Sequence, residues 1–266
     1  MSNTYPVFCT PRWFLTLKDQ LPPLPQKPMS PKGPKLIKKN FIEKLFLWCD
    51  EAEDQEINQR RLDRYRRELE KYNEALIKHK AKVAEVLSEN NIQSFREGYK
   101  KKLLSITLKA ADLSREVQKG RYEQLFKAKL VDAFGERIYD NMELNNNDQF
   151  YSYVPDFVYL DSLTGLSIDI EIDEPYSIPS KMPIHYIGTD DYRNDSFTQN
   201  GWFVIRFAEI QIALYPKECI EYIRSVINHI LNGTDISPFC YPIKQWDMME
   251  AYNMAKCNYR EQYNKL

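Results

Sequence analysis

The sequence predicts an α/β domain preceded by an all-α region, because the residue pattern changes character along the chain. Residues 36–119 contain no proline and one glycine, and they are rich in residues that favour helices. The pattern of residues 120–232 instead predicts elements in the order helix, strand, strand, helix, strand, helix. That order is typical of a core in which helices flank a mixed sheet. A chain of 266 residues is long enough for such a core and an appendage.

Residues 1–35 are rich in proline, which fixes the backbone angle φ and removes an amide donor. We therefore expect this segment to form an extended arm without a helix or a central strand. The aromatic cluster Trp13–Leu15 could dock on a neighbouring surface. The prolines that define the arm are Pro22, Pro23, Pro25, Pro28, Pro31 and Pro34.

Residues 36–119 are expected to form a helical hairpin or coiled coil. Apolar residues recur at alternating spacings of four and three, which is the heptad of a helical seam. Asn90–Asn91 interrupts this pattern, and a second amphipathic helix runs from Phe95 to Ala110. The seam consists of Tyr65, Leu69, Tyr72, Leu76, His79, Val83 and Val86.

The first predicted helix also carries a series of basic residues. These could follow a phosphate backbone, but acidic residues are interleaved with them, as in a salt-bridged helix exterior. We expect the seam to pack against the second helix or against another subunit, so a homodimer or a protein partner could form through this region. The basic residues are Arg60, Arg61, Arg64, Arg66, Arg67 and Lys71.

The α/β region, residues 120–232, divides into six predicted elements. Its first two strands are expected to pair as a hairpin around the turn Thr164–Gly165, because both are rich in alternating and β-branched residues. Residues 233–266 follow as a helical tail that is expected to pack on the core through residues such as Trp246. The elements are a helix at 122–134, strands at 150–160 and 166–172, a helix at 191–200, a buried strand at 202–207 and a helix at 216–231.

The overall charge offers no field to attract a polyanion, because the formal net charge is −1. Contact with nucleic acid would therefore depend on a local basic surface. The five cysteines are scattered without the spacing of zinc ligands, and we expect them to be reduced thiols in a cytoplasmic protein. No segment has the continuous apolar run of a signal peptide or a membrane span, so no membrane partner is expected.

Acidic residues gather on the two strands of the predicted hairpin. Asp156 follows Pro155 on the first strand, and Asp169, Glu171 and Asp173 occupy alternate positions on the second. Alternation places the latter three on one face of the sheet, where a solvated polar face is the ordinary alternative. Cross-strand neighbours, however, lie close enough for Asp156 and an acidic partner to share Mg²⁺ or Mn²⁺. Such an ion can support hydrolysis of a phosphodiester.

These residues resemble the motifs of the PD-(D/E)xK nucleases, and within that superfamily the group related to very-short-patch-repair endonucleases. The resemblance covers about 110 residues and implies a restriction-endonuclease-like core. It rests on Glu123 in the first helix, Pro155-Asp156, Glu171-x-Asp173, Tyr192-Arg193 and the strand Gly201–Phe207.

The resemblance implies a ligand set for the metal. Asp156 and Glu171 are the principal ligands, Glu123 completes or orients the site, and the carbonyl of Ile172 is a further ligand. The superfamily lysine stands two residues after the strand glutamate, but this chain has Asp173 there. The group that would stabilise the charge of the reacting phosphate is therefore unassigned.

Four basic side chains could replace the missing lysine, and each has an ordinary alternative. His185 could be a general base or a donor to phosphate, or a packed or surface histidine. Arg193 and Arg206 could contact substrate or could hold carboxylates in structural ion pairs. Lys181 could be an ordinary solvated lysine.

The sequence thus predicts a Mg²⁺- or Mn²⁺-dependent endonuclease that hydrolyses phosphodiester bonds, most plausibly in DNA, in repair, restriction or defence. Catalytic roles are expected for Glu123, Asp156, Glu171, Asp173, His185 and Arg193. Two alternatives stay open: a catalytically inactive nuclease-fold module for binding or assembly, and an RNase that uses the same site.

Overall fold

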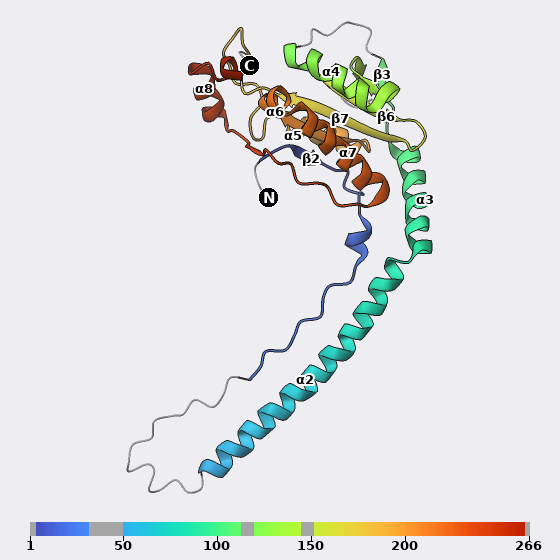
Figure 1. Ribbon diagram of the computed structural model, residues 1–266, viewed down its shortest axis with the longest axis vertical. Helices are drawn as coiled ribbons and strands as arrows, with labels where there is room; N and C mark the ends of the chain where they lie inside the picture. The colour runs from blue at the N-terminus through green and yellow to red at the C-terminus, as the bar shows by residue number, and fades with distance from the viewer. Residues whose placement is uncertain (1–3, 32–49, 113–119, 145–151, 264–266) are drawn as a thin grey trace. The chain divides into compact units, whose positions relative to one another are not determined.

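A computed structural model describes residues 4–31, 50–112, 120–144 and 152–263 (Figure 1). The chain forms two compact units, one of Leu17–Gln93 and the other of Met1–Thr16 together with Ser94–Leu266. The predicted beginning of the helical region, the polar turn near residue 146 and Cys49 lie outside the described residues. The four cysteines within them are free thiols, as expected.

The unit of residues 17–93 contains a short 3-10 helix, η1 (Leu17–Gln20), and the long helix α2 (Asp50–Val86). The seam residues of α2 are partly buried, with Val86 at 7% exposed. One of them, His79, places its Nε2 2.9 Å from the carbonyl oxygen of Pro22. The proline-rich arm therefore contacts the seam of the helix.

The basic series of α2 lies on the exposed side of that helix. Arg60 pairs with Glu56 at 2.5 Å, and Arg66 pairs with Asp63 at 3.5 Å. These pairs match the expected salt-bridged exterior. The expected partner helix exists as α3 (Glu89–Ile106), while its pairing with α2 as a hairpin stays a prediction.

The second helix ends earlier than the sequence predicted. α3 stops at Ile106, so Ala110 lies outside it, and β3 (Ala111–Asp112) pairs with β5 (Met142–Glu143). Tyr99 and Leu103 of α3 join the core of the larger unit. The sequence grouped this helix with the preceding one because both share the same helical composition.

A five-stranded mixed sheet forms the centre of the larger unit, in the order β2-β8-β7-β6-β4. The predicted hairpin is confirmed as β6 (Phe157–Asp161) and β7 (Leu166–Asp173), which run antiparallel, but β6 begins later than predicted, so Asp156 directly precedes the strand that was expected to carry it. The predicted third strand is β8 (Phe203–Ala208), and it runs parallel to β7. β4 (Ile138–Tyr139) closes one edge of the sheet.

The other edge strand comes from the segment that was expected to be only an extended arm. β2 (Val7–Cys9) pairs antiparallel with β8, and β1 (Thr4–Tyr5) pairs with β9 (Ile243–Lys244) in the tail. Both strands precede the dense prolines, so their amide donors are available. The aromatic cluster that follows also docks, since the Phe14 ring lies 5.1 Å from that of Phe203.

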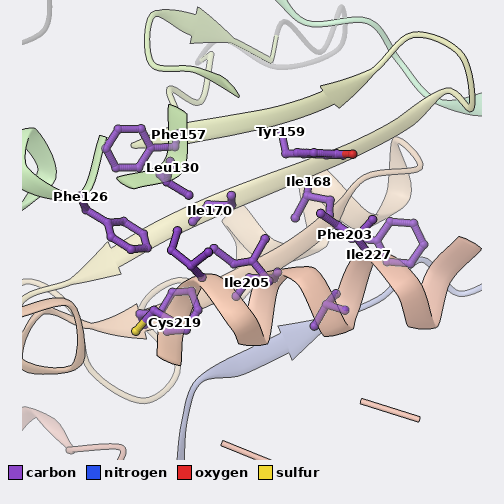
Figure 2. Packing of buried hydrophobic residues seen from close by; sticks show 14 of the residues in the cluster. Phe126, Leu130, Phe157, Tyr159, Ile168, Ile170, Phe203, Ile205, Cys219 and Ile227 are labelled. Carbon is purple, nitrogen blue, oxygen red and sulfur yellow. The ribbon is translucent and has the colours of Figure 1, made fainter. Parts of the chain in front are cut away.

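Helices cover both faces of the sheet. α4 (Arg121–Phe134) and α7 (Pro216–Asn232) contribute to the main apolar core, which also contains the isoleucines of β7 (Figure 2). On the opposite face, Phe197 of α5 (Asp191–Gln199) joins a second cluster with Val158 and Val204. α5 therefore packs on the face that carries the acidic residues of β7.

A short helix, α6 (Glu209–Leu214), lies between β8 and α7 in the sequence, and the tail contains α8 (Met248–Lys256) and α9 (Tyr259–Tyr263). Trp246, which was expected to pack on the core, is 2% exposed and belongs to a cluster with Tyr5. No helix among the described residues is both long and apolar enough to span a membrane.

Candidate functional site

The acidic face of β7 is buried, and the alternative of a solvated polar face is therefore wrong. Asp169 is 0% exposed, and Glu171 and Asp173 are each 2% exposed. Burying carboxylates costs free energy unless they are paired, hydrogen-bonded or protonated. The residues that surround these three side chains consequently decide the chemistry of the site.

Asp156 and Glu171 are brought together by the register of the hairpin. Phe157 lies opposite Ile170, so the two carboxylates stand at neighbouring positions of the paired strands. The Asp156 amide donates to Glu171 Oε1 at 3.3 Å, and the Ile172 amide donates to Asp156 Oδ2 at 2.8 Å. The two predicted principal ligands are thus held beside each other by backbone hydrogen bonds.

The surroundings of Asp156 disfavour its ionised form. Burial raises the pKa of Asp156 well above its usual value, and the charges of Glu171 and Glu123 raise that pKa further. Glu123 is half-buried near the beginning of α4, where its Oε1 accepts from the Gly120 amide at 3.0 Å. All three predicted carboxylate ligands therefore lie within electrostatic reach of one another.

Arg193 reaches Glu171 from α5. Its Nη2 donates to Glu171 Oε1 at 2.5 Å and to the carbonyl of Val154 at 2.7 Å. Burial by itself would raise the pKa of Glu171, but the charges of Arg193 and Arg206 outweigh burial and lower it. Glu171 is therefore a carboxylate in the folded protein, and Arg193 is its nearest counter-charge.

Asp173, at the position of the superfamily lysine, is the partner of Arg206. The Arg206 guanidinium donates to both oxygens of Asp173, from Nη2 at 2.6 Å and from Nε at 3.0 Å. The Tyr5 hydroxyl donates to the same carboxylate, to Oδ2 at 2.9 Å. Arg206 is 2% exposed and therefore holds acidic groups inside the protein.

His185 lies between acidic groups on several sides. Its Nδ1 is 2.9 Å from Asp190 Oδ2 and 3.8 Å from Asp173 Oδ1, and its Nε2 is 3.8 Å from Glu174 Oε2. Burial lowers the pKa of His185, but the hydrogen bond to Asp190 and the charge of Asp173 raise it to about 9. A protonated imidazole donates hydrogen bonds, so this arrangement favours a donor over a general base.

Asp173, His185 and Asp190 also form the one group of three, within the described part of the chain, whose metal-binding atoms lie within 4.8 Å of one another. Arg206 Nη2 reaches all of them, at 2.6 Å from Asp173, 3.1 Å from Asp190 and 3.4 Å from His185. A cation of the chain itself therefore already balances this group.

Asp169 differs from its neighbours on β7. Neither of its oxygens has a hydrogen-bond partner of acceptable geometry among the described residues, and its strand neighbours are Val158 and Val204. Burial and then the charge of Glu171 raise the pKa of Asp169 well above its usual value. The other two acidic residues of this face, Glu171 and Asp173, each accept a hydrogen bond from an arginine.

The ligand set suggested by the resemblance is compatible with Mg²⁺ or Mn²⁺ in its chemistry. Asp156, Glu171, Glu123 and the Ile172 carbonyl offer only oxygen atoms, which these ions prefer. The raised pKa of Asp156 also records a repulsion between carboxylates that a divalent cation relieves. The remaining candidate cation, Lys181, lies elsewhere, with its Nζ 2.8 Å from Asn258 Oδ1 in the tail.

Sequence reasoning did not identify several residues around this site. Asp190 stands where a helix cap is expected, directly before α5, but its side chain makes no capping bond and contacts His185 and Arg206 instead. Tyr5 and Glu174 were also missed. Asp190 had a weak local signal, whereas Tyr5 had none, because it lies 168 positions from Asp173.

The chain was compared with protein-family models, with curated proteins and with solved structures, and none of them matches it.

Proposed function

We propose that the protein is a divalent-metal-dependent endonuclease whose sheet and helices form a restriction-endonuclease-like core. The observation that carries the proposal is the contact between Asp156, directly before β6, and Glu171 of β7, with Glu123 close enough to raise the pKa of Asp156. Burial and the charges of Glu171 and Glu123 raise the pKa of Asp156 by more than the charge of Arg193 lowers it, which supports a role in binding a cation.

Asp156, Glu171, Glu123 and the Ile172 carbonyl would hold Mg²⁺ or Mn²⁺. Such an ion, when bound, lowers the pKa of a coordinated water and stabilises charge on a phosphodiester. Arg193 keeps Glu171 ionised and oriented through its bond at 2.5 Å. Its side chain is 19% exposed against 3% for Arg206, so Arg193 is the better placed of the two arginines to meet a phosphate as well.

His185 would act as a donor in this scheme. Its imidazole is 21% exposed, and its raised pKa keeps it protonated at neutral pH. A protonated imidazole can donate to a phosphate oxygen or orient Asp190 and Asp173. Arg206 donates from Nε, Nη1 and Nη2 to groups inside the protein and serves to hold Asp173 in place.

The test is cleavage of plasmid and oligonucleotide DNA with Mg²⁺ or Mn²⁺ and with a chelator. Wild-type protein should cut only with the metal, and Asp156→Asn or Glu171→Gln should reduce the rate by at least about 1000-fold. The exposed acid variant Asp132→Asn controls for a general change of charge. Cleavage that persists in both site variants would contradict this assignment.

The second candidate is a nuclease fold that binds or assembles without catalysis. It is favoured by the two arginines, since Arg193 bonds Glu171 and Arg206 balances the charges of Asp173 and Asp190. Calorimetry with Mn²⁺ separates the two proposals. A nuclease should give a heat of Mn²⁺ binding that is lost in Asp156→Asn, whereas an inactive module should give no such heat. Matched DNA and RNA strands would then distinguish a DNase from an RNase.

A further inference from the structure

Tyr5, in the first strand of the chain, lies inside the network of the candidate site. We propose that Tyr5 is a positioning residue, which fixes Asp173 and through it the guanidinium of Arg206 beside Glu171. The inference rests on the proposed function of the site and extends it to a segment far from the acidic strands in sequence. Strand β1, which carries Tyr5, is thereby part of the site.

The contact of Tyr5 with Asp173 is buried and specific. Tyr5 is 3% exposed, and its hydroxyl donates to Asp173 Oδ2 at 2.9 Å. Asp173 Oδ2 also accepts from Arg206 Nε at 3.0 Å, while Oδ1 accepts from Arg206 Nη2 at 2.6 Å. Three donors therefore determine the orientation of one carboxylate, and Tyr5 is the donor that does not itself carry charge.

Asp173 transmits this constraint to Glu171 through Arg206. Arg206 lies opposite Glu171 in the pairing of β7 with β8, and its Nη2 is 3.8 Å from Glu171 Oε2. The same nitrogen is 3.1 Å from Asp190 Oδ2. A rotation of Asp173 would consequently move the guanidinium relative to both Glu171 and Asp190.

Tyr5 is itself anchored from three directions. Its backbone pairs with Ile243 of β9, and its carbonyl accepts from Gln211 Nε2 at 3.2 Å. Its ring lies 5.0 Å from that of Trp246. The Trp246 indole in turn donates to the carbonyl of His185. The beginning of the chain and the tail thus meet at the same two site residues, Asp173 and His185.

The protein contains a matched control for this arrangement. Tyr263 is also 3% exposed, and its hydroxyl donates at 2.6 Å to Glu209, which pairs with Arg260 at 2.6 Å. Each tyrosine therefore supplies one buried hydroxyl to one arginine-paired carboxylate. Only Tyr5 acts on a carboxylate of the acidic strand.

The experiment compares Tyr5→Phe with Tyr263→Phe in the full chain, since both substitutions keep the ring and remove one hydroxyl. We expect Tyr5→Phe to lower kcat for DNA about tenfold with little change in KM, and Tyr263→Phe to keep both constants. The imidazole resonances of His185 should move in Tyr5→Phe and move much less in Tyr263→Phe, because Arg260 reaches His185 through Glu174. The protein has three histidines, so a His185→Gln spectrum assigns them.

The spectra also separate failure of this inference from failure of the proposed function. If wild-type protein cleaves no nucleic acid, the proposed function fails, and the His185 resonances still decide whether Tyr5 positions the network. Unmoved His185 resonances in Tyr5→Phe, or equal changes in both tyrosine variants, would overturn the positioning role.

Discussion

Two buried clusters in this protein each contain a tyrosine, a carboxylate and an arginine, but their surroundings differ. The site triad consists of Tyr5, Asp173 and Arg206, and the tail triad consists of Tyr263, Glu209 and Arg260. In each, a tyrosine hydroxyl and an arginine donate to one carboxylate. The similarity allows the effect of the surroundings to be separated from the effect of the motif.

The tail triad is largely closed. Arg260 uses Nε and Nη2 on Glu209 and donates Nη1 to the carbonyl of Tyr176 at 2.8 Å. Its other acidic neighbour is Glu174, at 3.7 Å. Such an arrangement ties α9 to α6 and satisfies its own charges, as expected of a structural ion pair.

The site triad is instead open to other ionisable groups. Arg206 contacts Asp190 at 3.1 Å and lies 3.4 Å from His185 and 3.8 Å from Glu171. Arg206 Nη2 therefore lies within 4 Å of four ionisable side chains, with Asp173 the nearest at 2.6 Å. A buried tyrosine–carboxylate–arginine motif therefore becomes a candidate functional element through the other ionisable groups that it contacts.

The largest expected effect comes from Arg206→Met and Arg260→Met, which replace the arginine of each triad. Because either change leaves a buried carboxylate unpaired, each should cost roughly 3–5 kcal/mol of unfolding free energy. Chemical denaturation measures this cost. At low temperature, folded Arg260→Met should still cleave DNA, whereas Arg206→Met should not. Equal cleavage by the two folded variants would remove the functional distinction between the triads.

Arg193→Ala should have the next largest effect. Loss of its bond to Glu171 removes the nearest counter-charge, so we expect a cleavage rate about 100-fold lower, or about 2.7 kcal/mol in the barrier. Arg193→Lys should recover only part of the rate, because lysine lacks the planar fork. A wild-type cleavage rate in Arg193→Ala would show that a side chain other than Arg193 stabilises the charge of the reacting phosphate.

The pH dependence of stability should distinguish the site triad through His185. The pKa of His185 is raised from 6.5 to about 9, so its contribution to stability is fully present below about pH 6.5 and is lost as the pH rises through 9. Urea denaturation in a chelator should show this loss in wild-type protein. The slope should be shallower in His185→Gln, and an identical slope in both proteins would contradict the raised pKa.

The smallest effect is expected at Trp246. Trp246→Phe removes the indole bond to the carbonyl of His185 and should cost about 1 kcal/mol of unfolding free energy. Thermal unfolding measures this change. Tyr241→Phe, in a residue that is 43% exposed, provides the control and should be neutral. A neutral Trp246→Phe would show that the tail does not restrain His185.

Several features of the fold and the site were predictable because their signals are local. The alternation and turn residues of 150–172 predicted the hairpin, and that pairing places Asp156 beside Glu171. The helices α4, α5 and α7 and the strand β8 also had local signals in capping, composition and apolar runs. By contrast, the end of α3 at Ile106 and the strands β1 and β2 were missed.

The sequence by itself determined which side chains of β7 share a face, because side-chain direction alternates along any strand. Only the tertiary structure decided that α5 covers this face, that Arg206 pairs with Asp173, and that Tyr5 reaches the same carboxylate. Alternation carries no information about what packs on a face. Partners separated by 33 and 168 positions leave no local pattern, since their contact depends on the order of strands in the sheet.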